Sequence, residues 1–499
     1  MLFSILYHCL LSKVNSALQN PVLELTILVN ITLFSPLCTK KPHIKTNRDR
    51  ANFIKGLKFL LKYVKIVKNR LLGVFMALKD IGIGKKKFNM AEKPWKTPWY
   101  LTCLEAIILS YYMVIAKLKI KKDPSIKDIK GPFLMLQNHG SFIDFGLAVK
   151  AFKLRPMTWV SSIEEFNHRE WLLRSLGCFG KRKFTADLNV VKNIMHALKK
   201  QKLPVVIYPE ARFAFAGITE EIDAKSYARL IKMAGVPVVV GIAKGNFIRS
   251  PQWRKHPYQN IPAEMTLTQI ITKEETATLS AEEITKRIEK AFDYDDYKYW
   301  QESGRRIKSK KRAENLHKVL YQCPHCKKEF EMTSYGTTIE CKACGKKWTL
   351  TEYGKLVSDG EVYFEHIPDW YRWIRQNVET EVYEGRYSFK DTARIEKLIS
   401  SSKGFVPIGT VELTHGEDGW TAKGKLDNGE DFYLNRPVDS MYSCHIEYDY
   451  KKRGDALELA TTEDTYFVYP LNNENILTKF HFATEALYHK ITGDHIKKS

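Results

Sequence analysis

Two Cys-x-x-Cys pairs constrain the fold of this chain more than any other feature of its sequence. Cys323 and Cys326 form the first pair, Cys341 and Cys344 form the second, and fourteen residues separate the two pairs. Two such knuckles joined by a short β segment are typical of a zinc ribbon, in which four thiolates close a tetrahedron around one ion. Because four sulfur ligands leave no open coordination position, the pattern predicts a structural zinc ribbon over 321–356.

The charge of the chain implies an anionic partner. Its 499 residues carry 79 Lys and Arg against 56 Asp and Glu, which gives a formal net charge of +23. Within 1–89, fifteen basic but only two acidic residues lie between Lys40 and Lys87, and apolar residues recur at helical steps from Asn52 to Lys79. These features indicate a basic amphipathic helix on anionic lipid. A soluble helix that packs on a neighbouring element has the same pattern. Translation that starts at Met90 is a further alternative, in which residues 1–89 would not normally be made.

No uncharged stretch reaches the roughly 20 apolar residues that crossing a bilayer requires. The sequence therefore predicts a peripheral protein on the cytoplasmic face of a membrane, or one with a single short N-terminal anchor. The basic composition and the ribbon also suggest a nucleic-acid-binding protein. However, the basic excess lies on a leucine- and valine-rich stretch, which suits anionic lipid better than nucleic acid.

Residues 90–295 alternate short apolar runs with helical periods, which predicts an α/β domain. The runs at 131–136, 204–208 and 236–242 are each bounded by Pro or Gly, as buried strands commonly are. The basic residues at 305–312 indicate a linker helix within 296–320.

Residues 357–499 are predicted to form a mostly β domain. A helix is expected to begin near Pro368, the sequence Asp427-Asn428-Gly429 indicates a hairpin, and a terminal helix is expected over 484–491. A pleckstrin-homology-like barrel has the same order of elements, several meandering strands followed by one helix. This likeness is an analogy at the level of the fold alone.

A histidine and an aspartate five residues apart directly follow the first apolar run of the α/β domain. If a helix starts near Ser141, the chain can fold back so that the carboxylate of Asp144 meets the imidazole of His139. A carboxylate on one ring nitrogen fixes the tautomer and raises the basicity of the other nitrogen, as a general base requires. The hydroxyl of Ser141 is expected to cap that helix rather than to act as a nucleophile.

The segment 138–144 resembles the first motif, Asn-His-x-Ser-x-x-Asp, of the lysophosphatidic acid (1-acyl-glycerol-3-phosphate) acyltransferase family. The segments 177–183, 208–212 and 236–240 resemble the family's other three motifs, in order, so that the resemblance covers about 95–270.

Two details depart from the family's pattern. The third motif is one residue shorter between its acid, Glu210, and its base, Arg212. The second motif has Arg182 one place before the usual cation, where Lys183 stands. Both departures concern the way in which a phosphate would be held.

The resemblance implies an O-acyltransferase of phospholipid synthesis. Its acyl donor would be acyl-CoA or acyl-carrier protein, and its acceptor a lysophospholipid, with 1-acyl-glycerol 3-phosphate first and glycerol 3-phosphate or another lysolipid as alternatives. His139 would be the general base and Asp144 its orienting partner. The acceptor would be held by Lys181, Arg182, Lys183, Glu210 and Arg212. A lipid-binding scaffold without activity is the alternative of another class, against which the intact pair of His139 and Asp144 argues.

Overall fold

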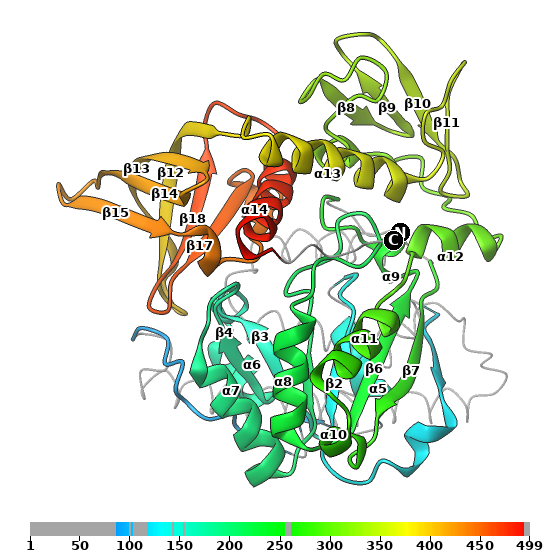
Figure 1. Cartoon of the computed structure of the whole chain (residues 1–499), viewed down its shortest axis with the longest axis vertical. Coiled ribbons are helices and arrows are strands. Elements are labelled where there is room, and N and C mark those ends of the chain that lie inside the picture. The colour runs from blue at the N-terminus through cyan, green and yellow to red at the C-terminus, as the bar shows by residue number, and fades with distance from the viewer. Residues whose placement is uncertain are drawn as a thin grey trace, which may run out of the picture.

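The computed structural model describes residues 86–98, 101–102, 117–141, 144–152, 155–254 and 261–493 (Figure 1). The amphipathic helix predicted over 52–79 lies outside these ranges. None of the described helices combines the length and the apolar character that crossing a bilayer would take.

The first domain is built on a seven-stranded sheet in the order β1-β7-β6-β2-β5-β3-β4. Strands β6 and β7 are antiparallel, and the other neighbours in the sheet are parallel. This mixed sheet confirms the predicted α/β domain. The strands are β1 (Lys119–Lys122), β2 (Leu134–Gln137), β3 (Thr158–Ser162), β4 (Cys178–Lys181), β5 (Val205–Ile207), β6 (Val238–Lys244) and β7 (Glu264–Ile271).

Helices cover both faces of this sheet, which explains why its central strands are apolar throughout. Along the fully buried centre of the sheet, Phe133 and Met135 join the core on one face, whereas Leu134 and Leu136 join the core on the other. The helices are α5 (Asp144–Ala151), α6 (Glu170–Ser175), α7 (Leu188–Met195), which continues as a π-helical segment (His196–Gln201), α8 (Ala224–Ala234), α9 (Asn246–Arg249), α10 (Glu275–Thr278), α11 (Ala281–Ala291) and α12 (Asp296–Glu302).

The basic stretch at 305–312 is irregular rather than helical, because α12 ends at Glu302. Arg312 donates hydrogen bonds to the carbonyls of Leu350 and Ser309, and Arg306 pairs with Glu352. Within the predicted linker helix over 296–320, the structure has α12 over the first seven residues and a short 3-10 helix, Leu316–Lys318, near the end. The basic residues between them tie the chain to the cysteine-containing segment.

The cysteine-containing segment is a four-stranded antiparallel sheet, in the order β11-β10-β9-β8. Each knuckle closes a turn, in which the N–H of Lys327 donates to the carbonyl of Cys323 at 2.9 Å and that of Gly345 to Cys341 at 2.8 Å. The strands are β8 (Met332–Tyr335), β9 (Thr338–Cys341), β10 (Lys347–Leu350) and β11 (Leu356–Val357).

The C-terminal domain is a seven-stranded antiparallel sheet with two long helices, α13 (Ile367–Tyr383) and α14 (Leu477–Thr492), which pack against each other beside the sheet (Figure 1). Its strand order is β15-β14-β13-β12-β18-β17-β16, and the predicted hairpin at Asp427 joins β14 to β15. Helix α14 is longer than the predicted 484–491. The likeness to a pleckstrin-homology-like barrel stays a prediction. The strands are β12 (Phe389–Ser400), β13 (Gly404–Gly416), β14 (Gly419–Lys425), β15 (Asp431–Arg436), β16 (His445–Glu447), β17 (Ala456–Ala460) and β18 (Thr465–Pro470).

The three parts of the chain share one apolar core. Helix α13 runs from the cysteine-containing sheet to the C-terminal sheet, across the top of the first domain in Figure 1. Phe215 and Phe247 of the first domain, Trp348 of the cysteine-containing sheet and Phe480 of α14 all belong to this core. The indole of Trp370 in α13 also donates to the carbonyl of Gln322 at 2.9 Å. The C-terminal domain therefore packs directly against the first domain.

Candidate active site

Three neighbouring strands of the first sheet end at one edge, and polar side chains follow each of them. His139 follows β2, Glu210 follows β5 and Asn246 follows β6, and these strands lie side by side in the order β6-β2-β5. Because the strands are parallel, their carboxyl ends meet at the same edge, where open α/β sheets commonly build their sites.

At this edge the carboxylate of Asp144 contacts the imidazole of His139. The distance from His139 Nδ1 to Asp144 Oδ2 is 3.1 Å, and the same oxygen accepts the backbone N–H groups of Gly140 and Ser141, each at 2.8 Å. The Asp144 side chain is fully buried, so these donors replace water around its charge. The turn thus brings the two groups together as their spacing predicted.

Helix α5 is described from Asp144 onward, and the two residues between Ser141 and Asp144 lie outside the described ranges. The Ser141 hydroxyl is buried, and within the described part of the chain it makes no hydrogen bond. The hydroxyl of Ser141 is therefore not the cap that was expected, and the backbone N–H of Ser141 instead donates to Asp144 Oδ2.

Two aromatic rings enclose the imidazole of His139. The ring of Tyr208 stacks on it with centroids 4.0 Å apart, and the ring of Phe213 lies 4.1 Å away. The His139 side chain keeps 20% of its surface exposed, and its Nε2 has no partner among the described residues. With Nδ1 turned to Asp144 and both faces of the ring covered, Nε2 is the atom that an incoming hydroxyl could reach.

The carboxyl group of Glu210 connects the backbone of His139 to the side chain of Tyr294. One oxygen accepts the backbone N–H of His139 at 3.4 Å, and the other accepts the hydroxyl of Tyr294 at 3.1 Å. Burial, with the nearby charge of Glu220, raises the pKa of Glu210 well above its usual range. Glu210 is fully buried in this arrangement, and it contacts His139 rather than Arg212.

The predicted phosphate-binding arginines face the C-terminal domain. Arg182 donates to the carbonyls of Thr462 at 2.9 Å and Glu463 at 2.7 Å. Arg212 has a fully buried side chain and pairs with Glu485 of α14 at 2.7 Å. The terminal nitrogens of both guanidinium groups thus donate to protein groups, whereas the Nε atom of each has no partner among the described residues. A role of these arginines in holding substrate stays a prediction.

The two predicted lysines differ in their surroundings. Lys183 Nζ lies 2.8 Å from His445 Nε2 and 4.0 Å from Glu164. Lys181, at the end of β4, has no hydrogen-bond partner among the described residues, and burial lowers its pKa. Of the four cations, Lys181 is the one that makes no hydrogen bond to the described protein groups.

A family model described as "Acyltransferase" matches residues 117–240, which contain His139, Asp144 and the aromatic rings around them. This part of the chain is an acyltransferase domain.

A search of curated proteins gives no match to the chain. Among solved structures, the chain is similar to the 1-acyl-sn-glycerophosphate (LPA) acyltransferase PlsC from Thermotoga maritima, with 15% identity and a TM-score of 0.30 over 39% of this chain and 75% of that one.

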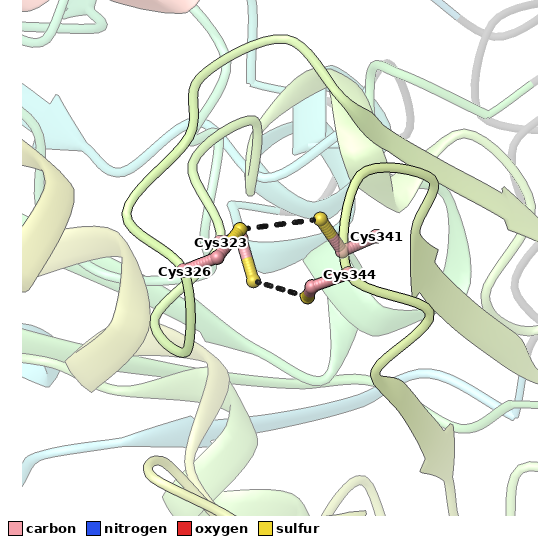
Figure 2. Close-up of side chains that lie close together, drawn as sticks. All are labelled: Cys323, Cys326, Cys341 and Cys344. Atoms are coloured by element: carbon pink, nitrogen blue, oxygen red, sulfur yellow. Dashed lines mark hydrogen bonds between the residues drawn. The ribbon is translucent and has the colours of Figure 1, made fainter.

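The four cysteines outside the acyltransferase domain form a cluster with the ligand set of a metal site. Their side chains point to a common centre from the two knuckles (Figure 2), and all four sulfur atoms lie within 4.8 Å of one another. The Sγ–Sγ distance is 3.8 Å for Cys323 and Cys344 and 3.7 Å for Cys326 and Cys341. Sulfur atoms bound to zinc at about 2.3 Å in a tetrahedron lie about 3.8 Å apart, so the residues fit zinc.

Two asparagines of the acyltransferase domain were not expected from the sequence. The amide of Asn138 exchanges two hydrogen bonds with the backbone of Ala243, at 2.9 and 2.7 Å, and so ties the end of β2 to β6. Asn246, which directly follows β6 and Gly245, donates to Asp144 Oδ1. A polar residue at the carboxyl end of a parallel strand is a signal that could have pointed to Asn246.

Proposed function

We propose that this chain transfers a fatty acyl group from an acyl thioester, acyl-CoA or acyl-carrier protein, to the hydroxyl of a lysophospholipid, with 1-acyl-glycerol 3-phosphate as the first candidate. The observation that carries the proposal is the contact of His139 with the buried carboxylate of Asp144 inside an acyltransferase domain. Substrate identity rests on the resemblance of the motifs.

In the proposed reaction, Nε2 of His139 takes the proton of the acceptor hydroxyl as the hydroxyl oxygen attacks the thioester carbonyl carbon. The carbon–sulfur bond then breaks, and the proton on Nε2 passes to the leaving thiolate. Asp144 holds the proton on Nδ1 and stabilises the imidazolium while it exists. An acyl-enzyme is not required, so Ser141 needs no role as a nucleophile.

The acceptor phosphate would first meet Lys181, whose amine is not engaged by described protein groups. Arg182, Lys183 and Arg212 would join it only if their contacts with the C-terminal domain were exchanged for the phosphate. Glu210 would act on His139 through its backbone, because its carboxyl group is buried beside that residue.

The proposed site of action is the cytoplasmic face of a membrane, which the basic segment between Lys40 and Lys87 would bind through anionic lipid. The cysteine cluster would hold one structural zinc ion. Zinc bound there would fix the two knuckles against α13 and take no part in the transfer.

A panel assay tests the proposal. The full chain, purified, is offered labelled acyl-CoA or acyl-carrier protein, with glycerol 3-phosphate, 1-acyl-glycerol 3-phosphate and lysolipids of other head groups, on vesicles that contain about one-third anionic lipid. Transfer to 1-acyl-glycerol 3-phosphate above the other acceptors supports the proposal. Preferred transfer to another acceptor corrects the substrate, and binding of the vesicles without any transfer favours a lipid-binding scaffold.

A further inference from the structure

The two carboxylate oxygens of Asp144 are held by different parts of the acyltransferase domain. Oδ2 accepts Nδ1 of His139 and the N–H groups of Gly140 and Ser141, all from the motif itself. Oδ1 accepts the amide Nδ2 of Asn246, which lies 102 residues further along the chain. Because Asp144 is fully buried, water does not solvate Oδ1, and Asn246 is the donor in its place.

The orientation of the Asn246 amide follows from its partner. Its oxygen would repel the carboxylate, so the NH₂ group must face Asp144. The Asn246 side chain is fully buried, and its Oδ1 makes no hydrogen bond with the described residues. The contact with Asp144 is therefore the one polar contact of this side chain within the described part of the chain.

The backbone on both sides of Asn246 is fixed by Asp296 of α12. The carboxylate of Asp296 accepts the N–H of Gly245 at 2.9 Å and that of Phe247 at 3.1 Å. Gly245 has φ +78°, and a Cβ there would come within 2.8 Å of the carbonyl oxygen of Pro262. The turn thus requires glycine, and it presents the Asn246 side chain in one direction.

This turn packs directly on the turn that carries His139. A Cβ at Gly140 would come within 2.9 Å of the backbone nitrogen of Phe247. The end of β6 and the end of β2 therefore cannot shift independently, and a change at Asn246 must reach Asp144 and His139.

We propose that Asn246 is a positioning residue for the base. It donates to the oxygen of Asp144 that does not contact the imidazole, and so keeps the carboxylate aimed at Nδ1 of His139. This role rests on the proposed function, because it concerns the proton that His139 takes in acyl transfer. Other titratable groups that face this site are Glu210, Tyr208 and Asp296.

The test compares Asn246→Asp and Asn246→Ala with the full wild-type chain. Its first readout is the titration of the His139 imidazole, followed by NMR with carbon-13-labelled histidine and assigned by its loss in His139→Gln. This readout needs no substrate. Its second readout is the pH dependence of kcat/KM for acyl transfer. The matched control is Asn193→Ala, which removes an equally buried amide whose donor bonds run to the carbonyls of Met90 and Glu92.

In Asn246→Asp, the new carboxyl group faces the buried carboxylate of Asp144, and the two share one proton because both cannot stay ionised so close together. We expect this change in the charge on Asp144 to move the midpoint of the His139 titration, and the rising limb of kcat/KM, by about one pH unit or more from their wild-type values. In Asn246→Ala, kcat/KM is expected to fall by about 10- to 100-fold. Asn193→Ala should change neither quantity.

An unchanged His139 midpoint in Asn246→Asp, together with kcat/KM within about twofold of wild type in Asn246→Ala, overturns the proposed role. Should Asn246→Asp fail to fold, judged by its circular dichroism, the decision rests on Asn246→Ala. A wild-type chain without transfer activity refutes the proposed function instead, and the titration then still decides whether Asn246 acts on the imidazole.

Discussion

At the scale of single residues, Arg212 joins two domains. Its guanidinium is fully buried, and it pairs with Glu485, which also pairs with Arg375 of α13. A buried charge that loses its partner destabilises a fold much more than an exposed one, because the remaining group stays out of water. Arg212 therefore contributes to stability whatever it does for a substrate.

We predict that Arg212→Ala lowers the free energy of unfolding by about 3–5 kcal/mol, measured by denaturant unfolding. The control is Arg306→Ala, which breaks the exposed pair with Glu352 and should cost less than about 1 kcal/mol. Unchanged stability in Arg212→Ala, with a raised KM for a phosphate-bearing acceptor, would show instead that this arginine serves the substrate.

At the scale of elements, the pairing of β13 with β14 contains a histidine kept out of water. His415 lies directly opposite Trp420, and their rings stack with centroids 3.8 Å apart. The hydroxyl of Tyr387 is hydrogen-bonded to its Nδ1 at 2.8 Å. Burial lowers the pKa of His415 to about 3.

Because the pKa of His415 is lowered in the folded chain, its contribution to the free energy of unfolding depends on pH. Below about pH 6.5 the unfolded chain binds a proton that the folded chain refuses, so this contribution is present above that pH and is lost as the pH falls toward 3. We predict that the stability difference between wild type and His415→Gln narrows between about pH 7 and pH 4, measured by thermal unfolding. A difference that stays constant over this range would contradict the prediction.

Closed four-cysteine sites commonly couple folding to metal binding, and we expect the same of the cysteine-containing sheet. We predict that the chain binds one zinc ion and that Cys323→Ser loses it, measured by elemental analysis. Hydrogen exchange should then speed up over 321–356. The control Cys178→Ser replaces a buried cysteine outside the cluster and should keep the metal. If chelation of zinc from the folded chain stopped acyl transfer at once, the purely structural role would be wrong.

At the scale of the whole molecule, local patterns predicted the parts of the chain, whereas contacts between distant segments escaped them. The α/β sheet, the cysteine knuckles and the hairpin at Asp427 follow from periodicity and spacing within short windows. The partner of Asp144 at Oδ1 is 102 residues away, and the partner of Arg212 is 273 residues away. Neither pairing leaves a periodic signal, because it depends on how the domains pack.

The same reason explains the elements that were predicted imprecisely. The basic residues after α12 looked helical by composition, but they bond to the cysteine-containing segment and follow an irregular path. Helix α14 begins seven residues before the predicted 484, at Leu477, because its first turns are buried in the core that the three parts share. Burial by distant segments decides both outcomes.

The most direct test of the account is the rate of acyl transfer by His139→Ala, measured with labelled thioester and the acceptor that the panel selects. Circular dichroism establishes that the variant is folded, and His196→Ala, on the π-helical segment after α7, is the matched control. The account predicts that the rate falls by about 10²–10⁴-fold in His139→Ala and stays at the wild-type level in His196→Ala. Transfer at a near wild-type rate by folded His139→Ala would contradict it.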